Sequence, residues 1–250
     1  MPPLRLGEMT TEECARLLAM PAPVVLLPVG STEPHGPHLP LATDAILSEH
    51  ACVRAAEALR EVNVAAVVAP TLAYGVTRYA RDFAGAVSLS PETTERVVSE
   101  LLGAYRAMGF AVACVVNNHL EPEHVESLAR ATRGVPGAVF ANQLTRRWGR
   151  TLSDEFKRGD CHAGEYETSL VMAARGDLVR EDVRATLDPV PISLSDAIRA
   201  GQKTFREMGS ERGYFGTPQA ATRDEGDGLY ARLVTMIVTE VREALGREDA

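Results

Sequence analysis

Carboxylates and imidazoles lie close together in two short polar segments of this sequence. Glu33 and His35 lie in the first segment, Asp44 follows shortly after it, and His119 and Glu121 lie in the second. Imidazole nitrogens and carboxylate oxygens are the ligands that proteins use for Zn²⁺ and Mn²⁺. Residues two positions apart in an extended chain point the same way, so each His and its neighbouring Glu can face one site. We therefore predict a two-metal centre with these five side chains as ligands and Asp44 placed to bridge the ions.

Both polar segments follow short apolar runs that are typical of buried strands. Residues 24–29 form the run before the first segment, and residues 111–116 form the run before the second. Two more strands are expected at 64–68 and 138–141. Patterns that favour helices alternate with these runs, at 11–20, 44–59, 91–108 and 122–132.

Strands that alternate with helices predict parallel βαβ units. We expect residues 1–250 to form a single domain with a three-layer α/β/α fold and a mostly parallel central sheet. Ligands bind such folds at the carboxyl ends of the strands. The two polar segments should therefore meet at one edge of the sheet.

Composition and charge restrict the class of partner and the compartment. The chain is 45% hydrophobic and has a net charge of -8, which disfavours nucleic acid as a partner. No run approaches the roughly 20 apolar residues of a membrane helix, and the N-terminus lacks the apolar core of a signal peptide. The expected location is therefore cytoplasmic, without membrane contact.

The four cysteines form no Cys-x-x-Cys pair, so their spacing indicates neither a zinc ribbon nor a disulfide framework. Cys161 lies beside His162, which leaves a catalytic thiol open as an alternative. The third polar segment, 160–169, contains both residues. It also contains the carboxylates of Asp160, Glu165 and Glu167.

The segment from Gly30 to Asp44 reads Gly-Ser-Thr-Glu-x-His-Gly-Pro-His-Leu-Pro-Leu-x-Thr-Asp and resembles the first signature of the creatininase family. The agreement continues through most of the chain, at Tyr74-Gly75, Phe83-Ala84-Gly85, the segment around His119, 162–169 and 213–216. The resemblance implies a creatininase-like α/β/α fold and a two-metal amidohydrolase, often with Zn and Mn. It also implies a homo-oligomer, since several members are hexamers.

The resemblance also assigns roles to single residues. By motif, Glu33 and His119 would hold one ion and His35 and Glu121 the other, with Asp44 as the bridge.

Six further residues receive expected roles beside the ions. His162 is the expected proton shuttle, because imidazole titrates near neutrality, with Glu165 or Asp160 orienting it or binding substrate. Glu167 is an alternative site residue or a carboxylate favoured by a helix N-terminus. Leu120 and Thr77 replace a Tyr and a Ser of creatininase and are expected to contact substrate.

The expected activity is hydrolysis of a linear or cyclic amide, a small-molecule substrate, by a hydroxide held between two divalent ions. Two alternatives in the same class are a formamide hydrolase for a pyrimidine nucleotide intermediate and a peptide-trimming hydrolase in cofactor maturation. Arg78 and Arg81 are candidate phosphate contacts for the first of these. An alternative of another class is a non-catalytic, metal-stabilised binding or assembly protein.

Overall fold

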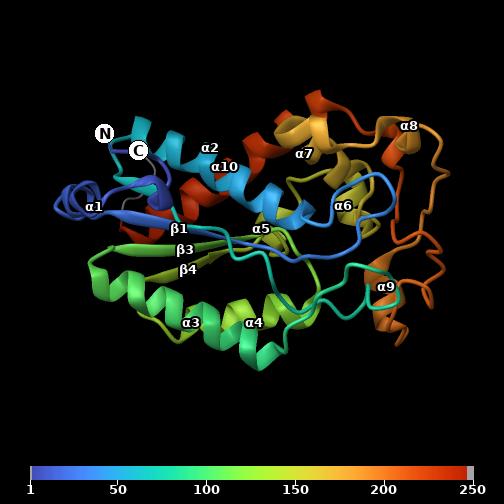
Figure 1. The fold of residues 1–250 in the computed structure, drawn as a ribbon, viewed down its shortest axis with the longest axis horizontal. Coiled ribbons are helices and arrows are strands. Elements are labelled where there is room, and N and C mark those ends of the chain that lie inside the picture. Colours follow the sequence, from blue (N-terminus) through green and yellow to red (C-terminus); the bar gives the residue numbers. More distant parts are fainter. Residues whose placement is uncertain (1, 247–250) are drawn as a thin grey trace.

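The computed structural model describes residues 2–246, which form a parallel sheet between two layers of helices (Figure 1). The strands are β1 (Val24–Val29), β2 (Ala66–Val68), β3 (Val112–Asn117) and β4 (Ala138–Ala141). They lie in the order β2-β1-β3-β4, and every pairing is parallel. The three-layer α/β/α prediction is therefore confirmed.

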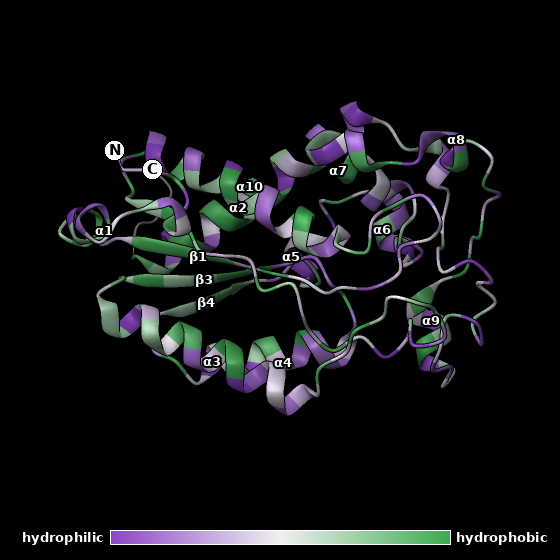
Figure 2. Cartoon of the chain, in the orientation of Figure 1, coloured by the Kyte–Doolittle hydropathy of each residue, from purple (hydrophilic) through white to green (hydrophobic). Residues whose placement is uncertain are grey.

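The helices are α1 (Thr11–Leu18), α2 (Thr43–Glu61), α3 (Pro91–Met108), α4 (Pro122–Arg133), α5 (Arg146–Gly149), α6 (Asp154–Arg158), α7 (Glu165–Arg175), α8 (Glu181–Arg184), α9 (Leu194–Arg199) and α10 (Arg223–Ala244). Helices α2, α7 and α10 cover one face of the sheet, and α3 and α4 cover the other (Figure 1). Strands β1 and β3 are strongly apolar (Figure 2), as expected of strands covered on both faces.

Alternate residues of β1 and β3 belong to two separate cores. Leu26 and Cys114 pack among α2, α7 and α10, whereas Leu27 and Val115 pack with α3 and α4. This division follows from the strand geometry, because successive side chains point to opposite faces. Two apolar layers therefore fix the position of the sheet, and with it the position of the loops at the strand ends.

Local sequence signals account for the ends of several helices. Thr10 and Glu13 form the expected capping box at the start of α1. The hydroxyl of Ser90 accepts the N–H of Thr93 at the start of α3, and Pro91 is the first residue of that helix. Helix α3 ends at Gly109, whose φ of 116° is left-handed. Among the described residues, no helix has both the length and the apolar composition needed to cross a membrane.

Strands β1 and β3 are adjacent and parallel, but the helices that follow them lie on opposite faces of the sheet. The chain runs from β1 into α2 on one face of the sheet, and from β3 into α4 on the other. The carboxyl ends of two such strands form the topological switch point where α/β proteins bind ligands. Both predicted polar segments begin at this point.

Candidate metal centre

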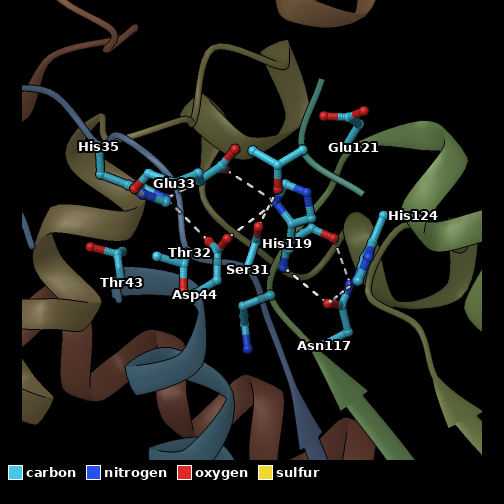
Figure 3. A network of polar contacts seen from close by, with 12 residues as sticks. Ser31, Thr32, Glu33, His35, Thr43, Asp44, Asn117, His119, Glu121 and His124 are labelled. Carbon is cyan, nitrogen blue, oxygen red and sulfur yellow. Dashed lines mark hydrogen bonds and ion pairs between the residues drawn. The ribbon is translucent and has the colours of Figure 1, made fainter. Parts of the chain in front are cut away.

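Five buried side chains from four parts of the fold converge at the switch point. Figure 3 shows four of them, Glu33, His35, Asp44 and His119. Glu33 and His35 come from the loop after β1, and His119 follows β3. Asp44 lies in the first turn of α2, and Glu167 lies in the first turn of α7. The sheet and the two helices therefore position all of these groups from separate directions.

The candidate ligand atoms form three overlapping groups, two of which share one carboxylate. Glu33, Asp44 and His119 form the first group, and His35, Asp44 and Glu167 form the second, each with its atoms within 4.8 Å of one another. Glu33, His35 and His162 form the third group. Nδ1 of His119 lies 3.1 Å from Oδ2 of Asp44, whereas Nε2 of His35 lies 3.1 Å from Oδ1. The two oxygens of Asp44 thus serve two different groups, which is the arrangement expected of a bridging ligand.

Three histidines are oriented by backbone carbonyls. One ring nitrogen of His35, His119 and His162 donates to a carbonyl oxygen, at 3.1, 2.6 and 3.0 Å respectively. The carbonyls belong to Glu33, Val76 and Pro34. The other ring nitrogen of each histidine faces the carboxylates. Such contacts fix the tautomer of metal-ligating histidines.

The electrostatics of the cluster fit a pair of cations. Oε2 of Glu33 is buried without a hydrogen-bond partner. Burial raises the pKa of Glu167 to about 8. Burial also lowers the pKa of His35, but Asp44 and then the other carboxylates outweigh it and raise the pKa to about 10. In the protein without ions, protons therefore compensate carboxylates that divalent cations would otherwise neutralise.

The spacing of the ligand atoms also fits zinc or manganese. Two atoms bound tetrahedrally at Zn–ligand distances of about 2.0–2.2 Å lie roughly 3.4 Å apart. Nδ1 of His119 is 3.1 Å from Oε1 of Glu33, and Nε2 of His35 is 3.4 Å from Oε2 of Glu167. The donor set and its geometry therefore suit two divalent ions.

Glu121 differs from its expected place among the ligands. None of the ligand groups found among residues 2–246 includes it, and Figure 3 shows its carboxylate apart from the central contacts. Its Oε2 accepts the backbone N–H groups of Arg78 at 2.8 Å and Tyr79 at 3.3 Å. Its Oε1 is buried without a partner, and burial raises the pKa of Glu121 to about 7. The carboxylate borders the centre without joining either ligand group.

Glu167 takes the place in the second group that the sequence-based hypothesis gave to Glu121. The other reading of Glu167, a carboxylate at a helix start, also holds, because Glu167 lies in the first turn of α7. Its Oε2 accepts the N–H of Ala163 at 2.7 Å. The sequence signal for this candidate ligand is its position in the segment that begins at His162. Its neighbour Glu165 instead lies near Thr217, with Oε2 3.4 Å from the hydroxyl.

His162 borders the ligand cluster from the side of α7. Its Nδ1 lies 3.7 Å from Oε1 of Glu33, and its ring centroid lies 4.5 Å from that of Phe205. Burial and then the charge of His35 lower the pKa of His162 to about 4. Asp160 is also buried, but its carboxylate faces the guanidinium of Arg158 at 3.4 Å.

A cavity of about 340 Å³ opens onto the cluster, and Glu33, Asp44, His119, Glu121, His162 and Glu167 line its polar side. Its other walls are mainly apolar, with Leu120, Leu144, Phe156, Leu194, Ile198 and Phe205 among the lining residues. The volume lies within the range of about 300–1,000 Å³ that is typical of ligand pockets. Leu120 thus has the expected position at a substrate wall.

Three other candidate residues lie in different surroundings. Thr77, Asp160 and Glu165 are not among the described residues that line the cavity. The Thr77 hydroxyl contacts that of Ser31. Cys161 does line the cavity, but burial raises the pKa of its thiol well above the ordinary value, which disfavours a thiolate nucleophile.

His124 supports the centre indirectly. Its Nε2 donates to Oδ1 of Asn117 at 3.0 Å, and its Nδ1 accepts the N–H of Val76 at 3.3 Å. Val76 in turn accepts the ring N–H of His119. His124 therefore helps to hold the carbonyl that orients a ligand.

Comparison with known proteins gives consistent matches along the chain. The family model for creatininase, described as creatinine amidohydrolase, matches residues 7–241. The mycofactocin precursor peptide peptidase of Mycolicibacterium smegmatis is 32% identical over 225 residues, which are 88% of this chain and 85% of the relative. The creatinine amidohydrolase of Pseudomonas putida is 26% identical, over 95% of both chains.

A solved structure agrees with these matches. A mutant creatininase of the Zn-Zn type superposes with a TM-score of 0.73 at 25% identity, and the match covers 97% of this chain and 98% of the other. The matched region includes both polar segments after β1 and β3 and the segment that begins at His162. On fold, motifs and sequence together, this chain belongs to the creatininase family, whose members are hydrolases.

Proposed function

We propose that this chain is a metal-dependent amidohydrolase that works with two divalent ions, Zn, Mn or both. The observation that carries the proposal is the position of Asp44, whose two carboxylate oxygens face histidines of two different ligand groups. A Zn-Zn type creatininase of the same fold supports the choice of metal.

Each ion has three candidate ligands. Glu33, Asp44 and His119 would hold one ion, and His35, Asp44 and Glu167 the other. When bound, two such ions act as Lewis acids toward an amide carbonyl and make water a nucleophile near neutral pH. The protein contributes the fixed geometry, because the ligands are buried and come from separate parts of the fold.

Two side chains flank the centre in positions suited to moving a proton. The Oε2 of Glu121 is held by two backbone amides, while its Oε1 has no partner and the residue lines the cavity. The Nδ1 of His162 faces the cluster, 3.7 Å from Oε1 of Glu33. We assign the proton transfer from water to the leaving nitrogen to these two residues, with Glu121 taking part instead of serving as a ligand.

The cavity favours a substrate with an extended apolar part. Apolar side chains from α6 and α9, together with Phe205, form much of its walls. Its volume suits a ligand larger than a small ring. Trimming of a peptide fits this cavity and the 32% identical peptide peptidase. A small cyclic amide is the second candidate, favoured by Glu121 at the cavity wall and by the creatinine amidohydrolase relative.

A nucleotide formamide is less favoured. The guanidinium of Arg78 pairs with Glu123 at 2.6 Å, and that of Arg81 donates to the backbone carbonyl of Lys203 at 3.1 Å. Neither arginine is among the described residues that line the cavity. The two arginines considered for phosphate binding therefore interact with other groups of the protein.

A hydrolysis screen tests the proposal. Chelated protein reloaded with Zn²⁺ or Mn²⁺ is incubated with peptides that have apolar ends, with formamides and with cyclic amides such as creatinine, and products are followed by mass spectrometry. We expect turnover that chelation abolishes and metal restores, and none from Asp44→Asn. Bound metal without turnover of any amide would support the non-catalytic alternative instead.

A further inference from the structure

Glu155 of α6 is a buried carboxylate whose partners are uncharged donors. It is 2% exposed. Its Oε2 accepts the backbone N–H of Tyr166 at 2.7 Å, and its Oε1 accepts that of Glu165 at 2.9 Å. Oε1 also accepts the N–H and the hydroxyl of Thr217, at 2.8 and 3.2 Å. One side chain therefore joins α6, the start of α7 and the segment around residue 217.

The contact with α7 replaces a missing cap. The residue before the helix is Gly164, which has no side chain to accept the first amides. The Glu155 carboxylate accepts two of these N–H groups and also places a negative charge at the helix N-terminus, where the dipole favours it. A Cβ at Gly164 would lie 2.6 Å from Oε2 of Glu155, so the glycine leaves the space that the carboxylate occupies.

The opposite side of the carboxylate is equally close-packed. Gly216 has a left-handed φ of 69°, and a Cβ there would collide with Oε1 of Glu155. The neighbouring Phe215 donates its N–H to the carbonyl of His162 at 2.8 Å. The segment that Glu155 holds through Thr217 therefore also supports the backbone of His162.

Two groups at the centre depend on the parts that Glu155 joins. Glu167 lies in the first turn of α7, and its carboxylate accepts the N–H of Ala163. His162 lies between α6 and α7 and is supported by Phe215. By contrast, Glu33 and His119 lie in the loops after β1 and β3 and Asp44 lies in α2. The hydrogen bonds of Glu155 to Glu165, Tyr166 and Thr217 reach none of these parts.

We infer that Glu155 is a positioning residue for one of the two ions, the one that His35, Asp44 and Glu167 would hold, and for the His162 backbone beside it. The inference rests on the proposed two-metal function. It assigns Glu155 no contact with substrate or metal. Its effect passes through the N-terminus of α7, which sets where the Glu167 carboxylate lies.

Zinc titration of the full chain after chelation tests this inference by calorimetry, independently of activity. Glu155→Gln keeps the size of the side chain but places an amide N–H₂ or a weaker acceptor against the backbone donors. We expect the affinity for one ion to fall by about 10–100-fold, the usual effect of removing a group that orients a ligand. The affinity for the other ion should not change. Asp154→Asn, next to Glu155 but exposed, is the matched control and should bind both ions normally.

If Glu155 had a purely structural role, its substitution would lower the affinity for both ions alike. Equal loss at both positions, or unchanged affinity at both, would therefore contradict the inference. Thr217→Val removes only one donor to Glu155 and should give a smaller loss at the same single ion, which keeps the test decisive if Glu155→Gln does not fold. Wild-type protein that takes up no zinc would instead overturn the proposed function itself.

Discussion

Nδ1 of His162 lies 3.7 Å from Oε1 of Glu33, while the other ring nitrogen donates to the carbonyl of Pro34. The ring is therefore locked with a nitrogen lone pair toward the ligand cluster. Burial, followed by the charge of His35, lowers the pKa of His162 to about 4, so the ring is neutral at physiological pH. A neutral imidazole in this place suits a proton acceptor or a further ligand, and the two roles have different consequences.

We predict that His162→Ala keeps both ions and loses catalysis by about 10²–10⁴-fold, the usual cost of removing an acid–base group. Metal analysis, a rate with an identified substrate and a melting curve are measured on the same preparation. Loss of one ion would make His162 a ligand. A near-normal rate with both ions bound would remove it from the mechanism.

The Glu121→Gln variant distinguishes between a metal ligand and a proton-transfer group, the two roles considered for that carboxylate. We expect two ions to remain bound, because Glu121 lies outside both ligand groups, and the rate to fall by about 10²–10⁴-fold. The amide keeps the shape of the side chain and an oxygen for the N–H of Arg78. Release of one ion from this variant would restore Glu121 to the ligand set.

Asp44→Ala should release both ions, because its two oxygens serve both groups. His38→Ala is the matched control, since His38 is a fully buried histidine of the loop that carries Glu33 and His35 but belongs to none of the ligand groups. Its Nε2 instead lies 3.0 Å from the hydroxyl of Thr168. The His38→Ala variant should retain metal even if its stability falls. Equal metal content in the two variants would refute the bridging role of Asp44.

The chelated protein should become less stable as the pH rises. His35 has a pKa of about 10 in the folded state against an ordinary value of 6.5, so its stabilising proton is fully bound below pH 6.5 and is lost as the pH approaches 10. Glu167, with a pKa raised to about 8 from 4.5, has the same sign. The loss of the Glu167 proton should lower the melting temperature between about pH 4.5 and pH 8, and the loss of the His35 proton should lower it between about pH 6.5 and pH 10.

Melting curves with and without chelator across this range check the prediction. With ions bound the decline should be smaller, since metal replaces these protons. The His35→Gln variant should also show a smaller decline after chelation. A chelated wild-type protein that gains stability at alkaline pH would contradict the proposed coupling between protons and metal.

Much of the fold follows from local sequence patterns. The strands at Val24–Val29 and Ala138–Ala141 have the predicted bounds, and Ser90-Pro91 marks the start of α3 as expected. The strand predicted at 64–68 is shorter, beginning at Ala66. Apolar runs and capping residues act over a few residues, so they can be read from the chain directly.

The candidate site was less accessible to sequence reasoning. The alternation argument placed Glu121 beside His119, but Glu121 has the N-cap position of α4, and the backbone amides of Arg78 and Tyr79 hold its carboxylate. Glu167 reaches the centre because α7 packs against α2 and α10. Contacts between such distant segments arise from tertiary packing, which spacing within one segment does not encode.

Metal counting on the full chain tests the central claim most directly. The protein is purified without chelator, analysed for Zn and Mn, then chelated and titrated with Zn²⁺. Two ions per chain are predicted for the wild type, with uptake of both lost in Asp44→Ala because that carboxylate belongs to both ligand groups. A wild-type protein that is purified without metal and takes up neither Zn²⁺ nor Mn²⁺ on titration would contradict the two-metal account.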